Sequence, residues 1–135
     1  MKAKVWLITG CSKGFGRELA KLVADKGHVV IATVRNETEV VGLEALSKGK
    51  IKGWVLDVTE AEAENRTRRL IKESFDGQVD VLVNNAGVAH GSLFLMTPIE
   101  DLRRVFEINL FSQIYLTQLV SKRMMRVKAG VIINM

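Results

Sequence analysis

A chain of 135 residues suits one domain and leaves little room for a second. Apolar residues make up 47% of it, which is typical of an ordinary globular protein and excludes a low-complexity one. The formal charge of +5 lies in short clusters of Lys and Arg that alternate with acids on predicted helices, so it indicates solvated helix faces and argues against a nucleic-acid partner.

Apolar runs of strand length alternate with helical patterns along the chain. Strands are predicted at residues 5–8, 29–32, 54–56, 79–83 and 131–133. Leu19, Leu22 and Val23 keep helical spacing after the first strand, and Gly27 marks the end of that helix. A short helix is predicted over residues 40–46, between the second and third strands.

Two capping-box patterns predict where the later helices begin. Thr59 and Glu62 have this spacing, so a helix is expected after residues 57–58. Thr97 and Glu100 repeat the pattern, and Pro98 between them suits the first position of a helix. This last helix is predicted to be long, over residues 98–125.

The alternation of strands and helices defines the expected fold class. Short apolar strands separated by helices predict an α/β fold with a parallel sheet that is covered on both faces. Right-handed crossovers then make it a doubly wound sheet, a Rossmann fold of about five strands. We expect residues 1–135 to form one such domain.

The turn after the first strand, residues 9–16, is rich in glycine and opens a helix. A phosphate that approaches a helix N-terminus meets unpaired N–H groups and the positive end of the helix dipole. Gly10, Gly14 and Gly16 would remove the side chains that obstruct this approach. The turn lacks the Gly-Lys-Ser/Thr ending of a P-loop, so we favour a dinucleotide over a nucleoside triphosphate. A purely structural glycine turn is the alternative.

The spacing Thr-Gly-x-x-x-Gly-x-Gly resembles the signature of the short-chain dehydrogenase/reductase family. Further motifs follow in the family's order: Asp57 after the third strand, Asn84-Asn85-Ala86-Gly87 after the fourth, and Asn109 in the long helix. The resemblance implies a nicotinamide dinucleotide cofactor. The cofactor-binding residues that it implies, besides the three glycines of the turn, are Ser12, Lys13, Phe15, Asp57, Val58, Asn84, Asn85, Ala86 and Gly87.

Some of these residues have simple structural alternatives. Asp57 could be an ordinary loop acid or a helix N-terminal group. Asn84 and Asn85 could satisfy backbone groups at the mouth of the sheet, and Asn109 could be a hydrogen-bonded polar residue of the core.

Residues after the second strand bear on the choice between NADP and NAD. An acid at this place holds the ribose 2′-OH of NAD, but here Arg35 follows Val34. A guanidinium can grip a 2′-phosphate through charge-assisted hydrogen bonds, and Lys13 could reach the same phosphate. The sequence therefore favours NADP, with NAD as the alternative.

The catalytic groups that the resemblance implies are a Ser, a Tyr, a Lys and an Asn. Asn109 matches the Asn, whereas the single tyrosine, Tyr115, has Leu119 four residues later and not a lysine. We expect an NADP-dependent oxidoreductase that transfers hydride between the cofactor and a small carbonyl or alcohol substrate. The chain by itself is expected to be inactive and truncated before the catalytic Ser and Tyr-x-x-x-Lys. The alternatives are a non-catalytic NADP-binding module and an interaction subunit that pairs with a full-length relative.

An incomplete domain has consequences for association. The fifth strand would form the C-terminal edge of an incomplete sheet, with unpaired backbone groups. The long helix over residues 98–125 would expose Phe111, Ile114 and Leu119, so we expect a homo-oligomer through this helix.

The remaining features predict neither a metal site nor a membrane partner. Cys11 is the single cysteine, and His28 and His90 lack metal-ligand spacing. No apolar run reaches the roughly 18 residues that span a bilayer. The N-terminus runs into a strand without a targeting segment, so we expect a cytoplasmic protein.

Overall fold

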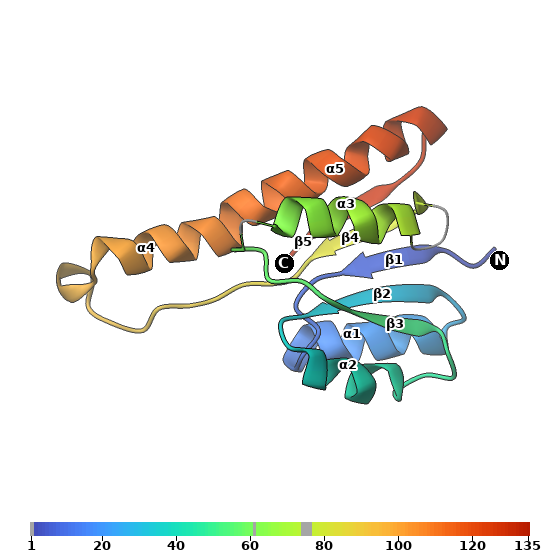
Figure 1. The fold of residues 1–135 in the computed structure, drawn as a ribbon, viewed down its shortest axis with the longest axis horizontal. Helices are drawn as coiled ribbons and strands as arrows, with labels where there is room; N and C mark the ends of the chain where they lie inside the picture. The colour runs from blue at the N-terminus through green and yellow to red at the C-terminus, as the bar shows by residue number, and fades with distance from the viewer. Residues whose placement is uncertain (1, 61, 74–76) are drawn as a thin grey trace.

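The computed structural model describes residues 2–60, 62–73 and 77–135 (Figure 1). Within these residues five strands form one parallel sheet in the order β3-β2-β1-β4-β5. The strands are β1 (Val5–Ile8), β2 (Val29–Val34), β3 (Ile51–Val55), β4 (Val81–Asn84) and β5 (Val131–Asn134). The predicted parallel sheet is therefore confirmed. Its second and third strands extend further than the apolar runs suggested, because backbone pairing continues through Thr33 and Lys52.

Helices cover both faces of the sheet, as predicted (Figure 1). α1 (Gly14–Asp25) and α2 (Glu37–Glu44) lie on one face, and α3 (Ala63–Glu73) and α5 (Ser112–Val127) lie on the other. On the first face Ala20, Val23 and Leu43 pack against strand residues such as Ile8 and Val30.

The second face has a core of its own. Leu70 of α3 and Leu116 and Val120 of α5 pack against Leu7 and Leu82 of the sheet. Strand residues are apolar on both sides because both sides are buried.

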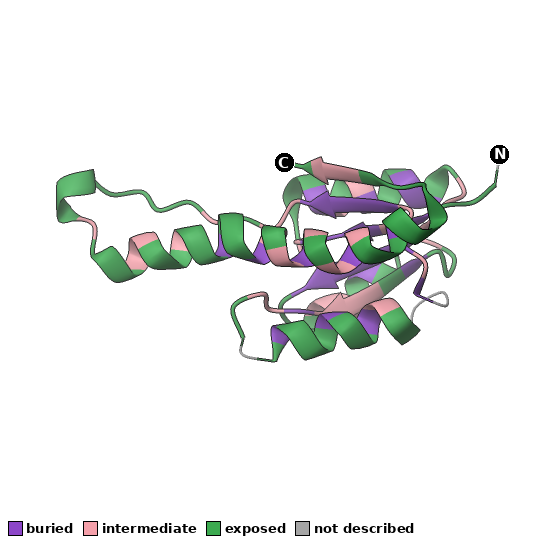
Figure 2. Ribbon diagram, turned by 90° about the horizontal axis from the view of Figure 1, so that it is seen from above, coloured by how far each residue is buried: buried purple, intermediate pink, exposed green. Residues whose placement is uncertain are grey.

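The long helix predicted over residues 98–125 has three parts. α4 (Ile99–Phe106) leads into a π-helical turn (Glu107–Phe111), which leads into α5. The turn puts one extra residue into the helix, and π-turns of this kind are frequent at functional sites. α5 lies along the sheet, whereas α4 and the segment before it project beyond the sheet (Figures 1 and 2).

Both predicted capping boxes are wrong. α3 begins at Ala63, and the Thr59 hydroxyl donates a hydrogen bond to Asp57 Oδ1 at 2.7 Å instead of capping a helix. α4 begins at Ile99, one residue later than predicted, so that Pro98 is its N-cap residue and not its first helical residue. The Thr97 hydroxyl donates to the Leu93 carbonyl at 3.0 Å. In each case the threonine hydroxyl donates to a nearby acceptor outside the helix. Short polar side chains often form such local hydrogen bonds in place of a helix cap.

No helix among the described residues is long and apolar enough to cross a membrane. The same residues contain no group of three or more His, Cys, Asp or Glu side chains that could hold a metal ion.

Candidate functional site

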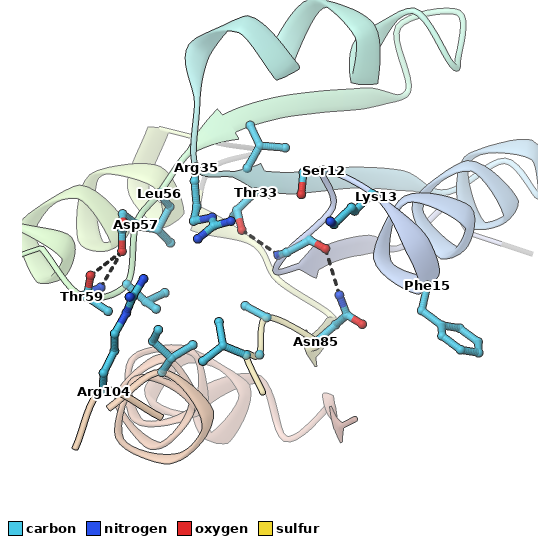
Figure 3. Close-up of a pocket in the computed structure, with 17 residues that line it drawn as sticks. Ser12, Lys13, Phe15, Thr33, Arg35, Leu56, Asp57, Thr59, Asn85 and Arg104 are labelled. Atoms are coloured by element: carbon cyan, nitrogen blue, oxygen red, sulfur yellow. Dashed lines mark hydrogen bonds between the residues drawn. The ribbon is translucent and has the colours of Figure 1, made fainter. Parts of the chain in front are cut away.

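A pocket of about 270 Å³ opens at the carboxyl ends of the strands (Figure 3). In doubly wound sheets ligands bind at this edge, where the connections to α1 and from β4 diverge. Of the predicted cofactor residues the pocket is lined by Gly10, Ser12, Lys13, Phe15, Arg35, Asp57, Val58, Asn85, Ala86 and Gly87. Residues from four separate connections thus meet around one cavity.

Hydrogen bonds lock the turn after β1 to the segment after β4. Asn85 Nδ2 donates to the carbonyl oxygens of Thr9 and Gly10, at 2.9 and 3.0 Å. In return the Thr9 hydroxyl oxygen accepts from the backbone N–H groups of Asn85 and Ala86, at 3.0 and 2.9 Å. These four bonds join residues about 76 positions apart, so they hold the turn in one shape.

Two glycines of the turn are required by this close contact. Gly10 has a φ of +69°, and a Cβ atom there would lie 2.8 Å from Ala86 Cα. A Cβ atom on Gly16 would collide with the Gly10 carbonyl group and with the Asn85 side-chain amide. Gly16 therefore lets α1 pack beneath the turn and does not itself line the pocket.

The start of α1 directs backbone donors toward this edge of the sheet. α1 begins at Gly14, which has a φ of +60°, after an extended Lys13. The first N–H groups of any helix lack partners within it, and they carry the positive end of the helix dipole. No acidic residue lies in the first turn of α1 to neutralise them. The turn can therefore receive an anionic group.

A cation follows the end of β2 and an anion follows the end of β3. Arg35 follows the last residue of β2, and Asp57 lies two residues past the end of β3. Partial burial raises the pKa of Asp57. Hydrogen bonds from the Thr59 hydroxyl and N–H, together with the charges of Arg35 and Arg104, outweigh burial and leave the pKa below its ordinary value. Asp57 is therefore an ionised acceptor at neutral pH.

The two adjacent asparagines have different positions. Asn85 lines the pocket, whereas Asn84 is fully buried and does not. Asn84 Nδ2 donates to Thr117 Oγ1 at 3.1 Å and to Asn134 Oδ1 at 2.9 Å, so it ties β4 to α5 and β5. The structure thus places Asn84 behind the site that its motif suggested.

Asn109 lies in the π-helical turn and bonds to the backbone of Val88. Its Oδ1 accepts from the Val88 N–H and its Nδ2 donates to the Val88 carbonyl, both at 2.8 Å. Asn109 is exposed and does not line the pocket, so the alternative of a core residue is wrong. Through Val88, which does line the pocket, it fixes the segment that follows β4.

Two other residues weighed in the sequence lie away from the pocket. Burial raises the pKa of Tyr115, and so does the neighbouring carboxylate of Glu64 on α3, so the phenol is a poor acid at neutral pH. His90 lies 3.7 Å from Asp101 on the projecting segment. Neither side chain lines the pocket.

Sequence reasoning missed several residues of the pocket: Thr33, Val34, Leu56, Thr59, Val88, Arg104 and Ile108. Thr33 accepts the Gly10 N–H on its hydroxyl at 3.3 Å. The pattern Asp-x-Thr would have indicated the bond between Thr59 and Asp57, because an Asp side chain often accepts from the residue two positions later. No local pattern marks Arg104 or Ile108, since only the placement of α4 and the π-helical turn brings them here.

The chain is similar to known proteins over nearly its whole length. The family model described as short chain dehydrogenase matches residues 4–135. The 3-oxoacyl-(acyl-carrier-protein) reductase FabG of Haemophilus influenzae is 35% identical over 134 residues, which are 99% of this chain and 55% of that protein.

Two solved structures share the arrangement of the elements. A short-chain dehydrogenase from Streptomyces avermitilis superimposes with a TM-score of 0.91 at 35% identity, over 98% of this chain and 48% of that one. A short-chain dehydrogenase from Sphingobium yanoikuyae in complex with NADPH gives a TM-score of 0.87 at 26% identity, over 97% and 52%. The chain spans about half the length of the curated relatives it matches.

Proposed function

The chain belongs to the short-chain dehydrogenase family, and from this premise we propose that it forms the cofactor site of an NADP-dependent oxidoreductase acting on a carbonyl or alcohol group. The observation that carries the proposal is the interlocked turn at Thr9 and Asn85, which presents free helix N–H groups beside two cations. A solved relative that binds NADPH supports the choice of cofactor.

The residues of the pocket fit the parts of such a dinucleotide. The N–H groups at the start of α1 suit the pyrophosphate, and Gly10 leaves it room. Asp57 and Val58 suit the adenine, whose amino group can donate to the carboxylate. Asn85, Ala86 and Gly87 suit the ribose and nicotinamide. When bound, the nicotinamide supplies or accepts the hydride of the reaction.

The choice of NADP over NAD depends on the positive charge at the end of β2. Arg35 and Lys13 line the pocket, and within the described part of the chain neither forms an ion pair. An uncommitted guanidinium binds a phosphate through two charge-assisted hydrogen bonds. A carboxylate, which would repel the 2′-phosphate, is absent from this position.

The test is calorimetric titration of the chain with NADPH and with NADH. Arg35→Ala is expected to raise the Kd for NADPH by about 10- to 100-fold, the equivalent of one charged hydrogen-bond pair, while the Kd for NADH changes little. Arg103→Ala, which removes an exposed cation outside the pocket, is the matched control. A wild-type chain that binds neither dinucleotide, or an equal loss for both on Arg35→Ala, would contradict the proposal.

Asn109 is proposed as a positioning residue for the reaction. It holds Val88, and with it Gly87, at the part of the pocket assigned to the nicotinamide. The family resemblance implies a proton relay through this asparagine. Tyr115 lies outside the pocket and has no lysine four residues later. We therefore propose that these 135 residues alone do not catalyse hydride transfer. Oxidation of NADPH by the purified chain with ketones and aldehydes, clearly above a heat-inactivated control, would contradict this.

Self-association through residues 98–125 is the proposed oligomer contact. Phe106, Leu110, Phe111 and Ile114 are exposed on α4, the π-helical turn and α5, whereas Leu119, also expected to be exposed, is half-buried. Contiguous exposed apolar groups of this kind mark association surfaces. Sedimentation velocity should show dimers or larger species that dissociate on Phe111→Ser, and a monomer at all concentrations would contradict the contact.

A further inference from the structure

Arg104 reaches the pocket from an element that the fold otherwise holds away from the sheet. α4 projects from the body of the molecule and has no buried residue. Its side chain Arg104 nevertheless lines the pocket, as does Ile108 one helical turn later. Figure 3 shows Arg104 extending from its helix toward Thr59 and Asp57. Arg104 and Ile108 thus form a wall of the pocket opposite the strand ends.

The charge of Arg104 is uncommitted in the described structure. It forms no salt bridge there, although Asp57 is near enough for the guanidinium to lower the pKa of its carboxyl group. Lys13 lies on the other side of the hollow, near the start of α1 (Figure 3). The pocket therefore extends from Lys13 past Arg35, whose charge also lowers the pKa of Asp57, to a second compartment between Asp57 and Arg104 (Figure 3).

The second compartment suits a flat aromatic base better than a phosphate. Leu56, buried at 3% exposure, and Ile108, at 7%, make its apolar walls, together with Val58. A phosphate in contact with such walls would lose hydration, and the ionised Asp57 would compete with it for the guanidinium of Arg104. A purine loses little hydration free energy there, and its exocyclic amine can donate a hydrogen bond to the Asp57 carboxylate.

We propose that Arg104 is an adenine-positioning residue, whose guanidinium covers the face of the purine held between α4 and the Leu56–Val58 segment. This inference rests on the proposed dinucleotide function and adds to it a contact from the projecting helix. A guanidinium is planar and weakly hydrated, so it stacks on base and aromatic faces more favourably than an ammonium does. Both dinucleotides carry the adenine, so Arg104 contributes to affinity without choosing between them.

The experiment is titration of wild type, Arg104→Ala and Arg104→Lys with NADPH, NADH and nicotinamide mononucleotide. Arg104→Ala is expected to raise the Kd of NADPH and of NADH by the same factor, about 3- to 30-fold, the range of one cation–π contact. Arg104→Lys keeps the charge and loses the plane, so it should restore only part of the affinity. Nicotinamide mononucleotide lacks adenine, and its weak affinity should not change. Arg103→Ala, on the same helix but outside the pocket, is the control.

The outcomes separate this inference from the proposed function. If wild type binds neither dinucleotide, both fail. If wild type binds and Arg104→Ala binds equally well, the adenine contact alone is wrong. A loss confined to NADPH would make Arg104 a ligand of the 2′-phosphate and overturn the adenine contact, as would full recovery by Arg104→Lys. Circular dichroism and the melting temperature of each variant show whether a loss comes from unfolding.

Discussion

Two regions of the molecule are built on different principles: the sheet with its β1–α1 turn, and the projecting arm, residues 89–106. The turn is held by hydrogen bonds between residues about 76 positions apart, over strands whose central residues are fully buried. The arm is held by bonds between near neighbours, such as Ser92 Oγ with Thr97 Oγ1 at 2.7 Å. None of its residues is buried.

The contrast shows where stability and where adaptability reside. Buried apolar contacts and long-range hydrogen bonds make a segment open only when the whole domain unfolds. Segments with few buried contacts open at lower cost. The side of the pocket proposed to receive the phosphate is therefore preformed, while the proposed adenine side depends partly on a helix that the described structure leaves largely uncovered.

The largest expected difference between the two regions is in the cost of removing a leucine. Leu7 is 0% exposed in β1, and Leu95 is 96% exposed in the arm. Leu7→Ala should lower the free energy of unfolding by about 2–5 kcal/mol, because it leaves a cavity between the sheet and helices α3 and α5. Leu95→Ala should change it by less than about 0.5 kcal/mol. Urea unfolding followed by circular dichroism measures both, and similar losses would remove the contrast.

A second pair tests the glycines. Gly16→Ala places a methyl group against the Gly10 carbonyl and the Asn85 amide, and should destabilise by about 1–3 kcal/mol, as overpacking does. Gly42 lies within α2 and has open space around it. Gly42→Ala should instead stabilise by about 0.5–1 kcal/mol through helix propensity. The melting temperatures of the two variants should move in opposite directions, and a stable Gly16→Ala would show that the turn is not close-packed.

The junction between arm and body gives a smaller, local effect. Asn109→Ala removes both bonds to Val88, and hydrogen exchange of the Val88 amide should accelerate about tenfold or less, the loss expected for an exposed pair. Amides of β4 should exchange as before. Asn65→Ala is the matched control, because the Asn65 amide donates to the Glu62 carboxylate of an exposed segment. Faster exchange throughout the sheet would mean that Asn109 supports the whole fold.

The smallest effect concerns the carboxylate between the two regions. Thr59→Val removes the hydroxyl that donates to Asp57, so the pKa of Asp57 should rise toward its ordinary value. Because this pKa is lowered in the folded chain, Asp57 adds stability above the ordinary carboxyl pKa, and that stability is lost as the pH falls through the folded pKa. The variant should therefore lose less stability in acid.

An NMR titration of the Asp57 carboxyl group measures the shift. Thr97→Val serves as control, since the Thr97 hydroxyl donates to a backbone carbonyl in the arm. An unchanged pKa in Thr59→Val would mean that the Thr59 backbone N–H and the two arginines lower it without help from the hydroxyl.

Much of the fold followed from the sequence because its signals are local. Apolar runs of three to five residues alternate with helical patterns, and they lie within or next to observed strands of four to six residues. Parallel strands buried on both sides need little else to be recognised. The capping patterns at Thr59 and Thr97 failed for a local reason too. A threonine hydroxyl can donate to any acceptor within reach. Here Thr59 donates to Asp57 and Thr97 donates to the Leu93 carbonyl.

The sequence by itself determined the parallel sheet, the glycine turn at its carboxyl edge and the cations beside that turn. Only the tertiary structure decided that Asn85 faces the pocket while Asn84 is buried behind it, that Asn109 bonds to Val88, and that Arg104 reaches the cavity. The patterns that predict strands and turns depend on residues close together in the sequence. Contacts between β4, the π-helical turn and α4 depend on how helices pack against a sheet, and no short stretch of sequence carries that geometry.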